Sequence, residues 1–335
     1  MITRRRLLIA LGLNALVIST STPSANAAPP PGKVLRIGLL DIVYESFDPY
    51  SDSVHRALLD GLRAHGYELG RNFMLEFRSA RGNPERLAEL AAELVRLKVD
   101  LLIPVFTQPT LAAREATKTI PIVMLGATDP VATGVVASLA RPGGNITGVS
   151  INAAEISAKR VQLLKEAVPK LSRVAVLWNS TLKSMTIGFQ QIEMASPGLG
   201  VTVQSLRVSG SDELDKAFAA ISQGRPDGLI ILYGPMRGND LPRIVEFVTR
   251  NGLPTVFEID RGVRGGGLME FGPNAKDLAR HIGAYVDKIA NGAKPADLPV
   301  EEPTNFELII NLKAAKTMGL TIPQSLLLRA DRLIK

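Results

Sequence analysis

The 335-residue chain has no cysteine and carries 39 Lys and Arg against 32 Asp and Glu, which gives a formal net charge of +7. Without cysteine the chain can form no disulfide and perform no thiol chemistry. The basic excess is modest and contains no run of like charges, so it does not indicate a nucleic-acid partner.

Residues 1–27 have the composition of a signal peptide. Arg4, Arg5 and Arg6 precede an apolar stretch over 7–18, and small residues at 25–27 offer a cleavage site. As a helix the apolar stretch would be about 18 Å long, which is too short to cross a membrane core of roughly 30 Å. We therefore expect residues 1–27 to direct export to the periplasm and to be removed.

Two export routes fit this segment. The paired arginines resemble a twin-arginine signal, although Leu7 stands where that pattern prefers Phe, and the general secretory route fits equally well. With no cysteine to carry a lipid, we do not expect a lipoprotein anchor. The mature chain has a net charge of 36 − 32 = +4 and no second long apolar stretch, so we expect it to be soluble.

Strand and helix patterns alternate along the first part of the mature chain. Asn83 and Pro84 open one helix as N-cap and first-turn proline. Such alternation predicts a parallel-sheet α/β architecture. The expected strands are 34–41, 73–77, 101–106 and 120–125, and the expected helices are 51–65, 83–97 and 107–117.

A stretch rich in glycine and proline, 126–150, follows these elements. It is too polar for a core element and too long for a simple turn. We interpret its first half, through Asp129 and Pro130, as the lip of a ligand site. Its second half, 141–150, is expected to lead out of the first unit of the fold.

The alternation then resumes. The segment 261–267 contains four glycines and is expected to interrupt it as a hinge or turn rather than as a phosphate-binding loop. The segment 295–303 is expected to be an extended linker. The expected strands or apolar runs are 146–151, 174–178, 201–208, 229–233, 254–259, 268–271 and 306–310, and the expected helices are 153–168, 184–195, 212–222, 241–250, 274–290 and 312–318.

Several segments together carry a family resemblance that covers nearly the whole mature chain. They are 81–95, 119–123, 128–130, 138–150, 266–269, 271–274, 293–300, 306–313 and 319–323. In these segments the chain resembles the periplasmic solute-binding proteins of ABC importers, in the branch that contains tryptophan- and tyrosine-type binding proteins.

The resemblance implies a type I periplasmic-binding-protein fold, in which two Rossmann-like lobes enclose a ligand cleft and three crossovers join them. Lobe one would comprise 33–148 plus 272–297, and lobe two 149–271 plus 298–335. The crossovers would fall near Gly148, Gly272 and Val300. Glycine or proline interrupts the alternation at these same places.

The position of a ligand follows from a rule about open α/β sheets, which bind ligands outside the carboxyl ends of their strands. Each residue that directly follows an expected strand is therefore a candidate. The loop 41–46, ending at Ser46, is one such place. The other candidates are Phe106, Thr107, Gln108, Thr128, Asp129, Trp178, Asn179, Ser180, Tyr233 and Glu258.

These residue types suit a zwitterionic amino acid. A carboxylate binds to N–H groups at a helix N-terminus and to a hydroxyl, an ammonium binds to a desolvated carboxylate, and an apolar side chain binds to aromatic rings. Each candidate also has a plain structural explanation, such as a helix cap, an Asx-turn or a core position. The carboxylate of the ligand would bind to Thr107 with Gln108 or to Asn179 with Ser180. The ammonium would bind to Asp129 or Glu258. The side chain would pack against Phe106, Trp178 or Tyr233.

Two segments depart from the family pattern. The family usually has prolines after the equivalents of Trp178 and Asn179, whereas this chain has 180–183 without proline, which puts that part of the pocket in doubt. The segment 41–53 carries additional polar and aromatic residues. The ligand preference can therefore differ from that of any well-known member.

No enzyme motif is present in the sequence. His55, His65 and His281 do not have metal-binding spacing, and the chain lacks a hydrolase elbow, a phosphate-binding loop and a dinucleotide fingerprint. We therefore expect no catalytic residue, no metal and no cofactor.

Two functions fit these observations. The first is the solute-binding component of an ABC importer, a monomer that captures an amino acid or related small carboxylate by hinge closure and delivers it to a membrane permease. The alternative is an exported sensor that presents its ligand to a signalling receptor. A repressor is disfavoured because a signal peptide stands where a helix-turn-helix would be.

Overall fold

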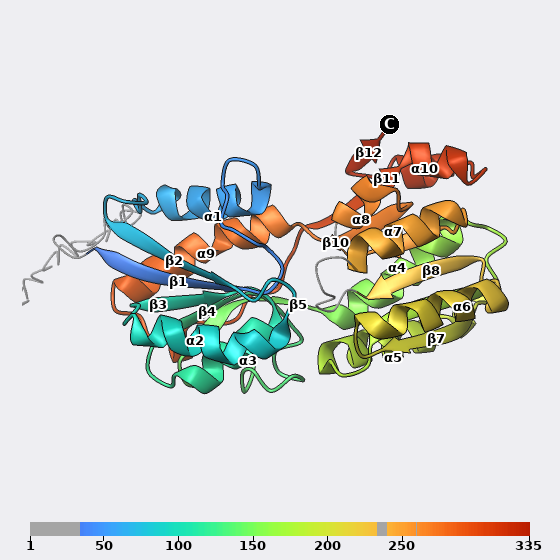
Figure 1. Cartoon of the computed structure of the whole chain (residues 1–335). Coiled ribbons are helices and arrows are strands. Elements are labelled where there is room, and N and C mark those ends of the chain that lie inside the picture. Colours follow the sequence, from blue (N-terminus) through green and yellow to red (C-terminus); the bar gives the residue numbers. More distant parts are fainter. Residues whose placement is uncertain (1–33, 233–239, 259) are drawn as a thin grey trace, which may run out of the picture.

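The computed structural model describes residues 34–232, 240–258 and 260–335, which form two α/β lobes side by side (Figure 1). The expected signal peptide lies outside this range. Within the described range, no helix is both long enough and apolar enough to cross a membrane.

Lobe one is a parallel sheet covered by helices on both faces. Its strand order is β2-β1-β3-β4-β5, and α1 with α9 covers one face while α2 with α3 covers the other (Figure 1). The elements are β1 (Leu35–Asp41), α1 (Ser53–Ala64), β2 (Phe73–Ser79), α2 (Leu87–Arg96), β3 (Leu101–Pro104), α3 (Thr107–Ala116), β4 (Ile122–Thr128), β5 (Ile146–Ile151) and α9 (Ala275–Ala290).

Lobe two is a larger sheet with the order β12-β11-β10-β9-β8-β6-β7. Its strands pair in parallel except that β11 runs antiparallel to β10. The elements are α4 (Ala153–Ala167), β6 (Arg173–Asn179), α5 (Lys183–Ala195), β7 (Thr202–Val208), α6 (Leu214–Gly224), β8 (Gly228–Leu232), α7 (Asp240–Arg250), β9 (Thr255–Phe257), α8 (Asp260–Gly265), β10 (Met269–Pro273), β11 (Phe306–Asn311), α10 (Leu312–Thr317), α11 (Gln324–Leu327) and β12 (Arg332–Ile334).

Most expected elements are confirmed, but α11 and β12 were not expected, and two segments differ from their expectation. The glycine-containing segment 261–267 does not simply interrupt the alternation, because α8 occupies its first part. Val263 is fully buried in the core of lobe two, and a Cβ at Gly262 would lie 2.1 Å from the Phe257 ring. Glycine is needed here so that a short helix can pack tightly against β9. The linker 295–303 also begins with a turn of 3₁₀ helix, Pro295–Asp297.

The connections between the lobes lie next to one another. Ser150 N donates to Glu301 O over 2.8 Å, and Glu301 N donates to Gly148 O over 3.0 Å. Asn274 N donates to Asn305 O over 3.0 Å. The boundary between the lobes was expected at 148/149. Strand pairing between β5 and β4 instead continues through Ile151, so the chain first passes from lobe one to lobe two after that residue.

Gly148 allows β5 to approach β4 closely. Its φ of +128° is unfavourable for other residues, and a Cβ there would lie 2.3 Å from Met124 O. Because β5 directly precedes the first crossing, this close contact fixes where the chain leaves lobe one.

We expect Gly148→Ala to lower the free energy of unfolding by about 3 kcal/mol or more, since it adds both a steric clash and backbone strain. Gly144→Ala is the matched control, because Gly144 has a φ of +83° but no atom within 4 Å of the added Cβ. The control should lose only about 1 kcal/mol. Equal losses in urea unfolding would contradict the steric explanation.

Candidate functional site

The carboxyl ends of β1, β3 and β4 bring most of the lobe-one candidates to one edge of the sheet. The three strands are neighbours and run parallel, so their following loops emerge together. Thr128 N donates to Thr107 Oγ1 over 2.9 Å, which joins the loop after β4 to the start of α3. Ser46 is exposed in the loop after β1.

Three buried acceptors at this edge receive no hydrogen bond from the described residues. They are Asp41 Oδ2, Gln108 Oε1 and Asp129 Oδ2, which follow or end β1, β3 and β4 respectively. A buried polar atom without a partner costs about 1–3 kcal/mol, so such atoms are rare unless a ligand or water completes them. The edge is therefore suited to a molecule that donates hydrogen bonds.

The backbone at the same edge is strained at two non-glycine residues. Phe106 has a φ of 71° and Asp129 a φ of 42°. Each is held by a backbone bond at 2.9 Å, from Phe106 N to Leu125 O and from Asp129 N to Ile151 O. Left-handed conformations of this kind cluster at binding sites, where the surrounding structure fixes them.

The N-terminus of α3 is open to an anion. No side chain caps it, so its first N–H groups and the positive end of its dipole face outward from the helix. The hydroxyl of Thr107 accepts from Thr128 N and can still donate its own proton. A carboxylate placed there would accept hydrogen bonds from the backbone N–H groups of α3 and from the Thr107 hydroxyl.

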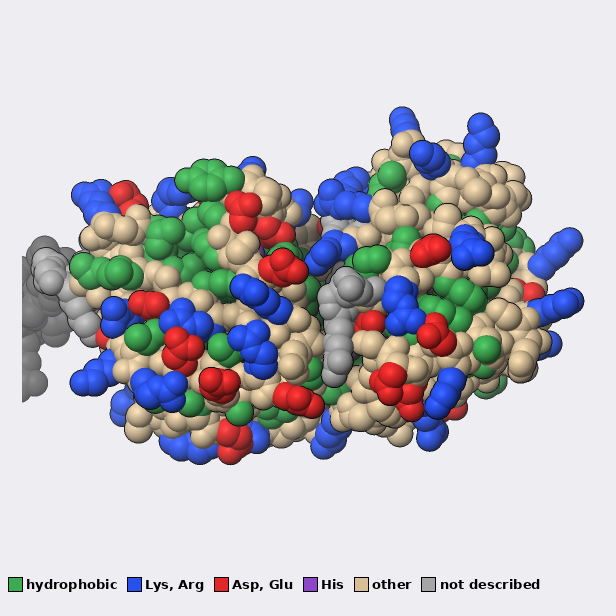
Figure 2. Space-filling model, in the orientation of Figure 1, with side chains coloured by type: hydrophobic (Ala, Val, Ile, Leu, Met, Phe, Trp, Pro, Cys, Tyr) green, Lys and Arg blue, Asp and Glu red, His purple; other side chains and the backbone are tan. Residues whose placement is uncertain are grey.

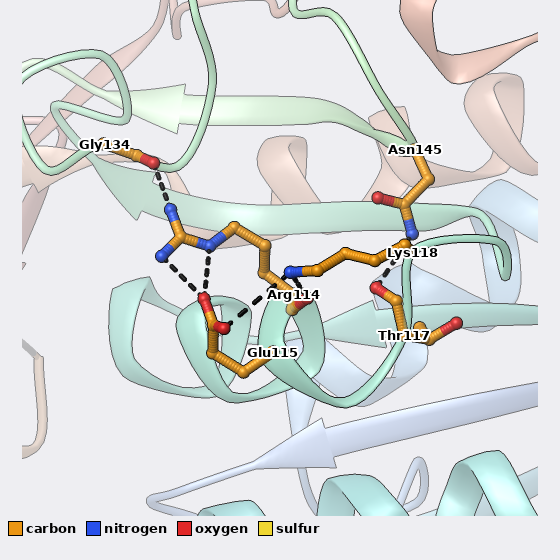
Figure 3. A network of polar contacts seen from close by, with 6 residues as sticks. All are labelled: Arg114, Glu115, Thr117, Lys118, Gly134 and Asn145. Atoms are coloured by element: carbon orange, nitrogen blue, oxygen red, sulfur yellow. Dashed lines mark hydrogen bonds and ion pairs between the residues drawn. The ribbon is translucent and has the colours of Figure 1, made fainter.

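A polar network holds the lip after β4 against α3 (Figure 3). Arg114 donates to Gly134 O and also forms an ion pair with Glu115 at 2.8 Å. Lys118 Nζ donates to Arg114 O over 2.7 Å, and Asn145 Nδ2 donates to Thr117 O over 3.3 Å. The network fixes the segment 129–145 relative to the helix that carries Thr107 and Gln108.

In lobe two, Trp178 is enclosed by its own lobe. It is 4% exposed, stacks on Phe189 at 4.5 Å and donates from Nε1 to Ser205 Oγ over 3.0 Å. The Arg207 guanidinium lies 5.6 Å from the ring centroid. In this arrangement, therefore, the indole offers little free surface to a ligand.

The other lobe-two candidates differ in availability. Asn179 is buried and its Oδ1 accepts from Thr181, while Ser180 is exposed. Glu258 forms an ion pair with Arg160 at 2.6 Å, so its charge is already compensated. Tyr233 lies outside the described residues.

Arg160 links this edge to the second crossing. Its side chain is 5% exposed, and its Nε donates to Phe271 O over 2.9 Å. The sequence patterns do not indicate this residue, although a charged residue within the helical segment 153–168 is a possible signal.

Comparison with known proteins identifies the family. The model of the family described as "ABC transporter substrate binding protein" matches residues 45–334. The chain belongs to this family. Its members bind the substrate of an ABC transporter.

Three relatives extend this result. A tyrosine-binding protein of Clostridioides difficile is 27% identical over 288 residues, covering 86% of this chain and 82% of that protein. A conserved domain protein from Vibrio cholerae has a TM-score of 0.82 at 27% identity, covering 90% and 100% of the two chains. The Streptococcus pneumoniae domain in complex with L-Trp has a TM-score of 0.81 at 26% identity, covering 90% and 99%.

Two further solved structures are less similar to this chain. The ligand-free, open structure of a Clostridium difficile substrate-binding protein gives a TM-score of only 0.66 at 25% identity, although the coverage, 90% and 100%, is similar. A leucine-binding protein of Thermotoga maritima shares the fold alone, with a TM-score of 0.54 at 17% identity. The type I periplasmic-binding-protein fold expected from the sequence is confirmed.

A cavity of about 460 Å³ lies elsewhere in this substrate-binding protein, within lobe two. Glu155, Lys159 and Gln162 of α4 line it together with Phe271 and Phe306. The three acceptors without partners do not line this cavity. We therefore place the candidate solute site at the edge of lobe one and not here.

Burial makes both carboxylates at that edge unfavourable as anions. Desolvation raises the pKa of Asp41 to about 6, although the N–H groups of Tyr44 and Val43 oppose the shift. Desolvation likewise raises the pKa of Asp129, with a smaller contribution from the charge of Glu302, while the Ala153 N–H opposes it. A ligand that carries a positive charge or donates a hydrogen bond would stabilise the ionised form of both carboxylates and lower their pKa values.

We expect Asp41→Asn to stabilise the ligand-free protein above pH 6. The Asp41 carboxyl binds its proton more tightly in the folded protein than in the unfolded chain, because its pKa is raised to about 6. The ionised carboxylate therefore lowers the stability of the folded state above pH 6. This loss of stability disappears below about pH 4, where the carboxyl is protonated in both states. The gain should be about 2 kcal/mol at pH 7.5, or roughly 5 °C in melting temperature.

The control is Asp60→Asn, which removes an exposed acid paired with Arg63 on α1. It should change the free energy of unfolding by less than about 0.5 kcal/mol. If melting of Asp41→Asn at pH 7.5 occurs at or below the wild-type temperature, Asp41 is not the unfavourable anion described above.

Proposed function

We propose that the solute is an amino acid, bound as a zwitterion at the carboxyl edge of lobe one. The observation that carries this proposal is the juxtaposition of unpartnered buried acceptors with an uncapped helix N-terminus. An amino acid presents an ammonium and a carboxylate on the same carbon, and this edge offers complementary groups in adjacent loops.

The ammonium is assigned to Asp129, and the carboxylate to the N-terminus of α3. The bond of 2.9 Å between Thr128 N and Thr107 Oγ1 supports this assignment, because it joins the end of β4 beside Asp129 to the start of α3. Gln108 Oε1 supplies a second acceptor for the ammonium. Charge-assisted hydrogen bonds of this kind are roughly twice as strong as neutral ones.

Phe106 and the edge of lobe two complete the proposed site. The Phe106 side chain is 37% exposed at the end of β3, so its ring can cover an apolar part of the solute. On the opposite lobe, the N-terminus of α5 has no side-chain cap, and Ser180 is exposed just before it. Contacts to both lobes would favour the closed state, since a ligand shifts a conformational equilibrium by its differential affinity.

The relatives support an amino acid as the solute class. One is a tyrosine-binding protein and another was solved with L-Trp. Both proteins are about a quarter identical to this chain, which is enough to suggest the class of solute and too little to name the compound.

The proposal includes a place in the cell and a partner. We infer that the signal peptide exports the chain to the periplasm by the Sec or Tat route, where it acts as a monomer that carries no lipid. It delivers the solute to a membrane permease and binds without catalysing a reaction. On the face shown in Figure 2, positive and negative side chains are interspersed over both lobes, an arrangement that suits a protein in free solution.

A thermal-shift screen of the mature protein tests the solute class. An amino acid present at about 100 times its dissociation constant should stabilise the folded state by about 2.7 kcal/mol. Nucleosides and sugars, which lack the zwitterion, should produce no shift. Shifts with those compounds and none with amino acids would contradict the proposal.

Asp129→Asn should weaken binding of every amino acid by about 10- to 100-fold, since it removes the charge that pairs with the ammonium. Isothermal titration calorimetry measures the change, and Asp60→Asn again serves as the control. Unchanged affinity would remove Asp129 from the site.

A further inference from the structure

We propose that Asp41 is a specificity-determining residue that accepts a hydrogen bond from the far end of the solute's side chain. The solute would then be an amino acid whose side chain ends in an O–H or N–H group. This inference rests on the proposed function, because it assigns the part of the solute that the zwitterion site leaves unbound.

The two oxygens of Asp41 have different surroundings. The side chain ends β1 and is 1% exposed. Its Oδ1 accepts from Val43 N at 2.5 Å and from Tyr44 N at 2.9 Å, which fixes the carboxylate in the turn. Its Oδ2 is buried and receives no hydrogen bond from the part of the chain that the structure describes. One oxygen therefore has a structural task, and the other remains available to a donor.

The donor does not come from a nearby cation of the described chain. None of the ion pairs among residues 34–232, 240–258 and 260–335 involves Asp41. The charge that acts on it is that of Asp52, which has the same sign. A buried carboxylate beside a like charge is stabilised when a ligand donates a hydrogen bond to it.

Asp41 and Asp129 lie too far apart to share one ammonium. β3 separates β1 from β4, so the two strand ends are two strand spacings apart, about 9.6 Å. The Asp41 carboxylate is fixed towards the turn at 43–44, and that of Asp129 is bonded to Ala153 N beyond β5. Each hydrogen bond reaches about 2.8 Å. A solute that bonds both carboxylates therefore needs two separate donors.

Aromatic side chains lie in and beside the loop that follows Asp41. Tyr44 and Phe47 pack on the His55 ring with centroids 4.5 and 4.6 Å away. Burial lowers the pKa of His55, which is 4% exposed, so its imidazole stays neutral. Phe106 is exposed at the end of β3, the strand next to β1, so aromatic side chains follow both strands at this edge.

The test uses pairs of amino acids that differ only in the terminal donor. The pairs are tyrosine with phenylalanine, tryptophan with 1-methyltryptophan, and lysine with norleucine. Isothermal titration calorimetry at pH 8 compares wild type, Asp41→Asn and the control Asp60→Asn. Asp41→Asn keeps the Oδ1 acceptor of the turn but replaces Oδ2 by an N–H₂ group, which opposes a donor on the solute.

We expect wild type to bind the donor-bearing member of at least one pair about 100-fold tighter or more, because a site built to bond a polar group rejects the analogue that lacks it. In Asp41→Asn this preference should fall at least about tenfold, and in Asp60→Asn it should persist. The melting temperature of each variant confirms that it is folded.

The possible failures are distinguishable. If amino acids bind but wild type does not separate the members of any pair, or if Asp41→Asn keeps the preference, the role of Asp41 is wrong and the proposed function stands. Uniform weakening of both members in Asp41→Asn would show a structural role in the turn and would also overturn the inference. If no amino acid binds to wild type, the proposed function fails, and this inference fails with it.

Discussion

Parallel pairing of β1, β3 and β4 in one sheet is the constraint on which the candidate site depends. It places the ends of three strands, and the start of α3, at one edge. Residues far apart in the sequence, Asp41, Thr107 and Asp129, then lie along the same edge of the sheet. The hydrogen bond between Thr128 and Thr107 and the network around Arg114 fix these loops relative to one another. The site is thus held by lobe one before any ligand or second lobe takes part.

This edge is arranged at some cost to the stability of the free protein. Buried acceptors without donors, raised carboxyl pKa values and left-handed backbone at Phe106 and Asp129 all oppose folding. Their coincidence at one edge is difficult to explain by packing alone, since the surrounding core is well formed. It is expected of a site that is complete only with its ligand.

Lobe two contributes differently. Its acidic candidate, Glu258, is already neutralised by the buried Arg160, and the Trp178 ring is enclosed by Phe189 and Ser205. Arg160 also bonds Phe271 O beside the second crossing, so the edge of lobe two is joined to the hinge. Lobe one thus carries buried carboxylate oxygens without a donor among the described residues, whereas the acid of lobe two is paired with Arg160. The bonds between the connecting segments join these segments to one another.

The sequence by itself determined the alternation of strands and helices and the loops that follow the strands, because apolar periodicity and glycine or proline interruptions are local signals. The two-lobe fold followed from the family resemblance. The sequence also nominated Thr107, Gln108 and Asp129 correctly as residues at the sheet edge. It could not tell that the segment 261–267 contains α8, since that helix depends on the contact of Gly262 with Phe257. Nor could it separate an acid that is paired, Glu258, from acids that are not, Asp41 and Asp129. Only the tertiary structure decided those points, because burial and hydrogen-bond partners come from residues distant in the chain.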